Sequence, residues 1–66
     1  MNNDIIKGEW KELKGSIMEK WGKLTDDDLT VINGSRTKLA GTIQKNYGIT
    51  LDEAEKQLKE WEKTLH

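Results

Sequence analysis

Apolar side chains recur at every third or fourth position in three stretches of the chain, which is the spacing that lines one side of an α-helix. The first stretch covers residues 6–21, the second 39–47 and the third 51–65. A shorter segment at about residues 26–33 also carries apolar residues on one face. No proline interrupts these segments, and the sequence shows no sustained alternation of the kind typical of strands. The pattern predicts an all-α fold of four helices with short connections.

The apolar stripes also predict the core. They consist of Ile6, Trp10, Leu13, Ile17 and Trp21, then Leu39, Ile43 and Tyr47, and finally Leu51, Ala54, Leu58, Trp61 and Leu65. In the short segment, Leu29 and Ile32 share one face, whereas Val31 is turned away from it. We expect the helices to pack around Trp10, Leu13, Ile17, Trp21, Leu39, Ile43, Tyr47, Leu58 and Trp61.

The two halves of the chain resemble each other. A shift of 26 residues aligns residues 8–22 with 34–48 and gives five identical positions, three of them glycines. We therefore expect a single domain, residues 1–66, that forms a four-helix bundle of two crossed helical hairpins related by approximate internal duplication. The hairpins would cover residues 5–33 and 35–65, with parallel up-and-down packing as the alternative. Glycines at the ends of the periodic stretches, Gly22, Gly34 and Gly48, are expected to cap helices.

Three consecutive aspartates in WGKLTDDDL, residues 21–29, are best explained as the start of a helix. Thr25 is positioned to cap that helix, and Asp28 can reach back to it in a capping box. Thr50 and Glu53 repeat this arrangement with the more usual Glu, so they are expected to form the standard box. The alternative is a divalent-ion site, but the alternating oxygen ligands, glycine and distant Glu of a calcium loop are not present.

Gly8 and Gly15 lie seven residues apart, as do Gly34 and Gly41, which places each pair on one flank of a helix. A glycine inside a helix costs up to about 1 kcal/mol relative to alanine. We expect this cost to be offset by close backbone approach where helices cross. A groove that docks a partner is the second explanation.

The charges of the second half are unevenly distributed. Residues 35–48 carry Arg36, Lys38 and Lys45 and no acid, whereas residues 49–66 carry five acids and three lysines. This asymmetry favours internal complementarity between neighbouring helices, with a contact surface as the alternative. The stem of Arg36 is expected to lie along the core edge with its head group near an acidic helix start.

The sequence shows no apparatus for catalysis. It has no cysteine and a single histidine, His66, at the end of the chain, and it contains no Gly-rich phosphate loop. The outer face of the last helix, which carries Glu55 and Lys59 four residues apart, is expected to be an ordinary solvated face. We therefore predict that the protein is not an enzyme and has no catalytic, cofactor-binding or metal-binding residues.

Size and net charge limit the partners. A chain of 66 residues buries only roughly 60% of the surface that it exposes when unfolded, so a large pocket is not expected. A formal net charge of −1 argues against bulk attraction to nucleic acid or anionic membranes. The longest apolar run is two residues, so no transmembrane span or signal peptide is expected. The sequence therefore favours a cytoplasmic protein that is a monomer or a weak homo-oligomer. A protein partner is possible, but the sequence does not identify it.

Three stretches carry a resemblance to a known family. They are GEWKELKGSIMEKWGKLTDDDL, the Gly-x-Arg-x-x-Leu-x-Gly-x-Ile-Gln-x-x-Tyr-Gly pattern at 34–48, and the Glu-Ala-Glu-Lys run at 53–56. Together they resemble the CsbD-like proteins, which are small bacterial polypeptides. The resemblance implies a cytoplasmic protein of the general stress response, folded as a compact helical bundle of two crossed hairpins. It supplies no catalytic or ligand residues.

Two functional hypotheses follow from the sequence and the resemblance. The first is a non-enzymatic stress-response protein of unknown molecular activity that acts through protein contacts or as a soluble protectant. The alternative is a small helical module that binds nucleic acid, with Arg36, Lys38 and Lys45 as its footprint. On a helical wheel, however, Arg36 points away from the two lysines.

Overall fold

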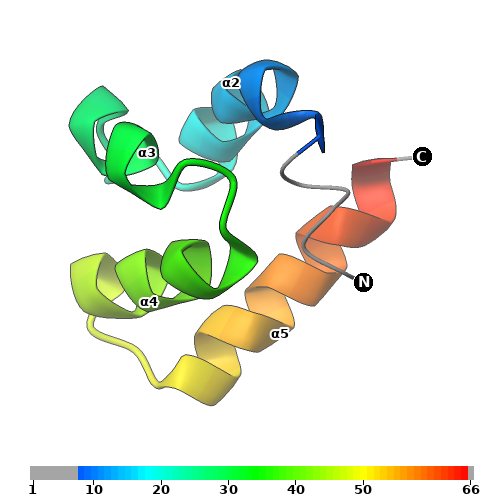
Figure 1. Ribbon diagram of the computed structural model, residues 1–66. Coiled ribbons are helices and arrows are strands. Elements are labelled where there is room, and N and C mark those ends of the chain that lie inside the picture. Colours follow the sequence, from blue (N-terminus) through cyan, green and yellow to red (C-terminus); the bar gives the residue numbers. More distant parts are fainter. Residues whose placement is uncertain (1–7, 66) are drawn as a thin grey trace.

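The computed structural model describes residues 8–65, and all regular secondary structure in this part of the chain is helical, without strands. It contains four α-helices and a short 3-10 helix, η1 (Figure 1). Their bounds are Trp10–Lys20 for α2, Asp26–Ile32 for α3, Arg36–Tyr47 for α4, Leu51–Glu62 for α5 and Lys63–Leu65 for η1. The predicted all-α fold is confirmed. Predictions that concern Ile6 and His66 lie outside the described residues.

The closest packing between helices pairs α4 with α5 and α3 with α4 (Figure 1). A short turn joins α4 to α5, and α5 runs diagonally across the molecule towards the C-terminus. α2 contacts α5 through side chains, because Ser16 on α2 bonds Trp61 on α5. The packing of α3 on α4 joins the two halves of the chain directly. The crossed-hairpin duplication stays a prediction.

One hydrophobic core lies between the four helices. Its members are Leu13, Ile17, Trp21, Leu24, Leu29, Ile32, Leu39, Ala40, Ile43, Ala54, Leu58 and Trp61. Of the predicted packing centre, Trp10 and Tyr47 are only partly buried at its edge, and the other seven are buried. Val31 is 70% exposed, as its position on the opposite face predicted. Leu51, a member of the last stripe outside the predicted packing centre, is 48% exposed at the first position of α5.

The start of α3 is a complete capping box. Thr25 N–H donates to Asp28 Oδ2 over 3.0 Å, and Asp28 N–H donates to Thr25 Oγ1 over 3.2 Å. The bond from the Thr25 backbone, helped by the Thr25 hydroxyl, lowers the pKa of Asp28 below its usual 3.8. Only half of the second predicted box is formed. Thr50 Oγ1 accepts from Glu53 N–H over 3.1 Å, but the exposed Glu53 side chain does not reach back to the Thr50 backbone.

One of the three predicted glycine caps is confirmed: Gly48 ends α4 in the left-handed conformation with φ of 64°. At the end of α3 the cap is the left-handed Asn33, and Gly34, with φ of 82°, is the residue after it. The prediction for Gly22 is wrong. The chain instead leaves α2 at Trp21, with φ of −118° and ψ of 81°, a conformation that needs no glycine and that accompanies the buried position of the indole ring.

The prediction of close backbone approach is wrong for Gly15 and Gly41. Among residues 8–65, a Cβ built on Gly8, Gly15 or Gly41 would meet no atom within 4 Å, so none of the three makes room for another helix of this region. Gly8 precedes α2, whereas Gly15 and Gly41 lie inside α2 and α4. The cost of Gly15 and Gly41 to helix stability is therefore not offset by packing against the described residues.

Candidate functional site along the last helix

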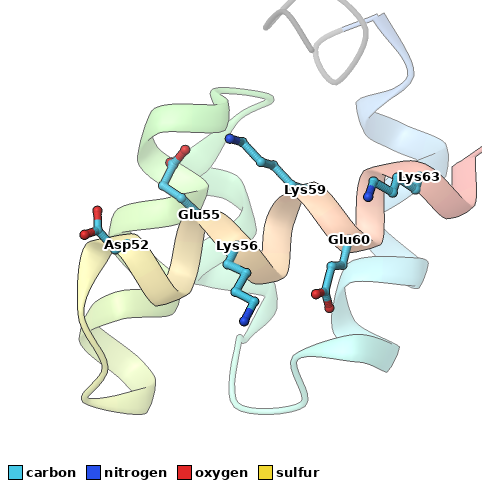
Figure 2. A pocket seen from close by; sticks show the side chains of 6 residues that line it. All are labelled: Asp52, Glu55, Lys56, Lys59, Glu60 and Lys63. Atoms are coloured by element: carbon cyan, nitrogen blue, oxygen red, sulfur yellow. The ribbon is translucent and has the colours of Figure 1, made fainter.

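The outer side of α5 and the start of η1 form a shallow, open depression (Figure 2). Figure 2 shows that the lining side chains fan out from the helix rather than converge on one point. The lining consists of three acids and three lysines: Asp52, Glu55, Lys56, Lys59, Glu60 and Lys63. All of them except Glu55 are exposed to solvent. Opposite charges in this arrangement form a hydrated mixed-charge face, and they supply no nucleophile held beside a base.

The inner edge of this face holds a cluster of three charged side chains. Arg36 Nη1 lies 2.8 Å from Glu55 Oε2, and Arg36 Nε lies 3.0 Å from Glu62 Oε2. Arg36 Nη2 also donates to Glu62 Oε1 over 3.4 Å, so the guanidinium engages both oxygens of that carboxylate. Glu62 is only 2% exposed. The cluster fixes the first turn of α4 to both the middle and the end of α5.

The positions of Arg36, Glu55 and Glu62 test three predictions made from the sequence. Internal complementarity between the basic and acidic segments is confirmed for Arg36 by its two ion pairs. Its predicted place near an acidic helix start is wrong, because Glu55 lies within α5 and Glu62 is the last residue of that helix. The predicted solvated outer face of the last helix is confirmed for the exposed Lys59, but Glu55 is only half-exposed and bonds to the Arg36 guanidinium.

The charge state of Arg36 follows from its surroundings. Burial by itself disfavours the charged form and lowers the pKa of Arg36, but the hydrogen bonds and charges of Glu55 and Glu62 outweigh burial and raise it. The guanidinium is therefore a permanent positive charge that its two partners neutralise. Because both carboxylates hold it, the guanidinium of Arg36 stabilises the fold and is not free to bind phosphates.

The proposed nucleic-acid footprint does not assemble on one face. Arg36 is engaged by α5, which leaves the exposed Lys38 and Lys45. The charge of Lys45 helps to lower the pKa of Asp28 at the start of α3, after the hydrogen bonds of Thr25 and Asn46. Lys45 thus also lies near an acid of its own chain.

Two tryptophans join α2 to α5. The rings of Trp21 and Trp61 meet edge to face, with centroids 5.6 Å apart and planes at 66°. Trp21 Nε1 donates to Gln57 Oε1 over 2.9 Å, and Trp61 Nε1 donates to Ser16 Oγ over 3.0 Å. The apolar periodicity located both rings, but it did not find Ser16 and Gln57. Their only sequence signal is that a buried indole N–H requires an acceptor.

The end of α4 holds the connection between α2 and α3. Tyr47 accepts a hydrogen bond at its hydroxyl from Lys23 N–H over 3.1 Å, and Lys23 Nζ lies 5.1 Å from the centre of the Tyr47 ring. Nearby, Asn46 Nδ2 donates to Asp28 Oδ2 over 3.3 Å. These contacts tie the start of α3 and the connection before it to α4, and they give the Tyr47 hydroxyl and Asn46 Nδ2 structural partners.

Residues 8–65 contain no group of three or more His, Cys, Asp or Glu side chains that could hold a metal ion. In the same region, every buried side-chain nitrogen and oxygen atom has a hydrogen-bond partner. No helix in the described part of the chain is both long and apolar enough to cross a membrane. The arrangement therefore consists of polar groups that bond one another, beneath a hydrated charged surface.

Comparison with known proteins identifies the family of the chain. A sequence model of the CsbD-like family matches residues 4–56. The UPF0337 protein YjbJ of Escherichia coli is 53% identical over 62 residues, which cover 94% of this chain and 90% of the relative. YjbJ of Salmonella typhimurium is 55% identical, and a UPF0337 protein of Protochlamydia amoebophila is 53% identical, each over 94% of this chain and at least 89% of the relative. The chain belongs to the CsbD-like family.

Proposed function

We propose that this CsbD-like chain is a non-enzymatic protein of the bacterial general stress response and that it acts in the cytoplasm as a soluble protectant. One observation carries the proposal: the buried polar and ionic side chains are engaged with one another. Arg36 is held by two glutamates, and both core tryptophans donate to side chains of the neighbouring helix. Chemical groups at active sites are instead left poised for a substrate.

The surface supports a protectant more than a specific binding protein. The outer face of α5 interleaves acids and lysines in equal number, from Asp52 to Lys63. A mixed-charge face of this kind stays hydrated and does not favour one partner of fixed charge. Action through contacts with a specific protein is the second form of the proposal. It would require a face on which binding is localised.

The two forms can be separated by NMR. We would record amide correlation spectra of the labelled chain in buffer and then in extract from stressed cells. A protectant gives small, uniform line broadening without localised shifts, whereas a specific partner shifts the amides of one face. A variant with Lys56, Lys59 and Lys63 changed to glutamine serves as the control for the α5 face, since all three are exposed. Strong localised shifts that survive in this variant would place a partner elsewhere and contradict the protectant form.

We further propose that the single domain, residues 1–66, consists of two crossed hairpins, 5–33 and 35–65, that arose by duplication. Support comes from the equivalent starts of α3 and α5, at which Thr25 and Thr50 each accept from the backbone N–H three residues later. A solution structure in which α2 with α3 superposes on α4 with α5 is the expected result. Clearly different crossing angles in the two pairs would count against duplication.

We expect the protein to be a monomer or a weak homo-oligomer. Sedimentation would establish its oligomeric state.

A further inference from the structure

α2 is the least secured of the four described helices. The other three each begin with a side-chain cap, from Thr25, Ser35 and Thr50. The N-cap of α2 is Glu9, and its side chain makes no capping hydrogen bond. A helix whose N-cap side chain makes no such bond lacks the stabilising contribution that a side-chain cap supplies.

The interior and the end of α2 show the same weakness. Gly15 lies in the middle of the helix, and a Cβ added there would meet no atom of residues 8–65 within 4 Å, so packing in this region does not compensate its lower helix propensity. α3 and α4 end in left-handed residues, Asn33 and Gly48, whereas α2 ends at Trp21 without one. α2 therefore depends on tertiary contacts to stay folded.

Within residues 8–65, the hydrogen bonds that tie α2 to another helix end on α5. The buried side chains of α2 are Leu13 and Ile17, and the side-chain bonds at Ser16 and Trp21 both reach α5 in this part of the chain. The closest backbone packing in the molecule is found elsewhere, between α4 and α5 and between α3 and α4. Beyond Trp21, the connection is held against α4 by Tyr47, so the chain has a fixed point next to the exposed Gly22.

We propose that α2 is a detachable helix: it opens about a hinge at Gly22 while α3, α4 and α5 remain folded, and it thereby uncovers the side of α5 that carries Trp61. Opening breaks the two indole hydrogen bonds and separates the rings of Trp21 and Trp61. It leaves in place the Arg36 cluster, which joins α4 to α5, and the cap of α3. Partial opening of this kind is available to segments that carry few stabilising contacts.

Native-state amide hydrogen exchange of the full chain tests the proposal, under conditions in which the exchange rate reports the opening equilibrium. In the wild type, we expect amides of α2 to exchange at least about tenfold faster than the slowest amides of α4 and α5. Gly15→Ala and Gly41→Ala form a matched pair, because both glycines lie inside a helix and have free space at Cβ. Neither substitution introduces a clash, so both variants should fold.

The two variants give different results if α2 opens alone. Gly15→Ala stabilises α2 and slows its amides roughly fivefold. Gly41→Ala stabilises α4 in both the native and the α2-open states, so it slows the most protected amides of α4 and α5 by a similar factor and leaves those of α2 unchanged. If Gly41→Ala slows α2 and α4 equally, or if all helices exchange at one rate in the wild type, α2 unfolds only with the whole chain and the proposal is wrong.

Discussion

Trp21 and Trp61 are linked reciprocally: their rings meet edge to face, and each indole N–H donates to a side chain from the segment that carries the other ring. Trp21 ends α2 and donates to Gln57 of α5, while Trp61 lies on α5 and donates to Ser16 of α2. Both indole rings are thereby buried while each indole N–H keeps a hydrogen-bond acceptor. In so short a chain, these two large side chains supply much of the core.

Ser16→Ala is expected to destabilise the protein by about 1 to 3 kcal/mol, because it leaves the N–H of the nearly buried Trp61 without an acceptor. Urea unfolding followed by tryptophan fluorescence measures the change. Glu19→Ala, at an exposed position of the same helix, serves as the control and should change stability by less than about 0.5 kcal/mol. Equal stability of the two variants would show that the indole bond contributes nothing.

Removing Arg36 should be among the most damaging single changes. Arg36→Met leaves the carboxylate of Glu62, 2% exposed, without its partner, and we expect a loss of about 3 kcal/mol. The double variant Arg36→Met with Glu62→Leu removes both charges and should recover most of that loss. Chemical denaturation of the single and double variants gives the coupling between the two residues. Simple additivity of the two changes would contradict a buried pair.

The start of α3 should depend on its acid more than the start of α5 does. Asp28→Ala removes the carboxylate that accepts from Thr25 N–H and is expected to cost about 1 kcal/mol. Glu53→Ala removes no such bond and should cost less. Thr25→Ala and Thr50→Ala each remove one hydroxyl acceptor and should each cost about 1 kcal/mol, whereas Thr25→Ser keeps the hydroxyl and should retain most of the stability. Thermal unfolding compares the variants, and a larger loss for Glu53→Ala than for Asp28→Ala would contradict the difference between the two boxes.

Acid should weaken the start of α3 in a predictable direction. The bonds from Thr25 lower the pKa of Asp28 in the folded chain below the 3.8 of the unfolded chain. The ionised carboxylate therefore stabilises the fold fully above pH 3.8, and this contribution is lost as the pH falls through the lower, folded-state pKa. Asp28→Asn should flatten the dependence of stability on pH in that acidic range. An unchanged slope would show that the carboxylate is not linked to folding.

Replacement of the open-space glycines should stabilise the protein. Gly15→Ala and Gly41→Ala are each expected to add up to about 1 kcal/mol, since the new methyl group meets no atom within 4 Å. A gain of about 1 kcal/mol raises the melting temperature of a domain of this size by about 4 to 8 °C. Gly48→Ala should destabilise instead, because its φ of 64° is unfavourable for alanine. Destabilisation by all three changes would contradict the free space at Gly15 and Gly41.

Local chemistry was readable from the sequence. Spacing along a helix identifies Leu13, Ile17, Leu39 and Ile43 as core, because the faces of a helix are set by its own period. Thr25 and Asp28 were likewise identified, because a cap joins residues that are close in sequence. The failure at the interior glycines has the opposite cause: their cost can be seen in the sequence, but whether a neighbour lies against them depends on how the helices pack.

The sequence did not predict which side chains distant along the chain bond to each other. Arg36 and Glu62 are 26 residues apart, and Trp61 and Ser16 are 45 apart, so their pairing is decided by the crossing of helices rather than by local pattern. The complementarity of the basic and acidic segments predicted that charges would meet, but it did not predict which ones. Glu55 was accordingly placed on a solvated face, although it bonds Arg36.

Protection of a heat-labile enzyme tests the proposed function most directly. The enzyme is heated with increasing amounts of this chain, and its remaining activity and turbidity are compared with those in an equal mass of an unrelated small folded protein. We expect protection that rises with concentration and that weakens when Lys56, Lys59 and Lys63 are changed to glutamine, because the mixed charge of the α5 face is then lost. Protection no greater than that of the unrelated protein at any concentration would contradict the protectant function.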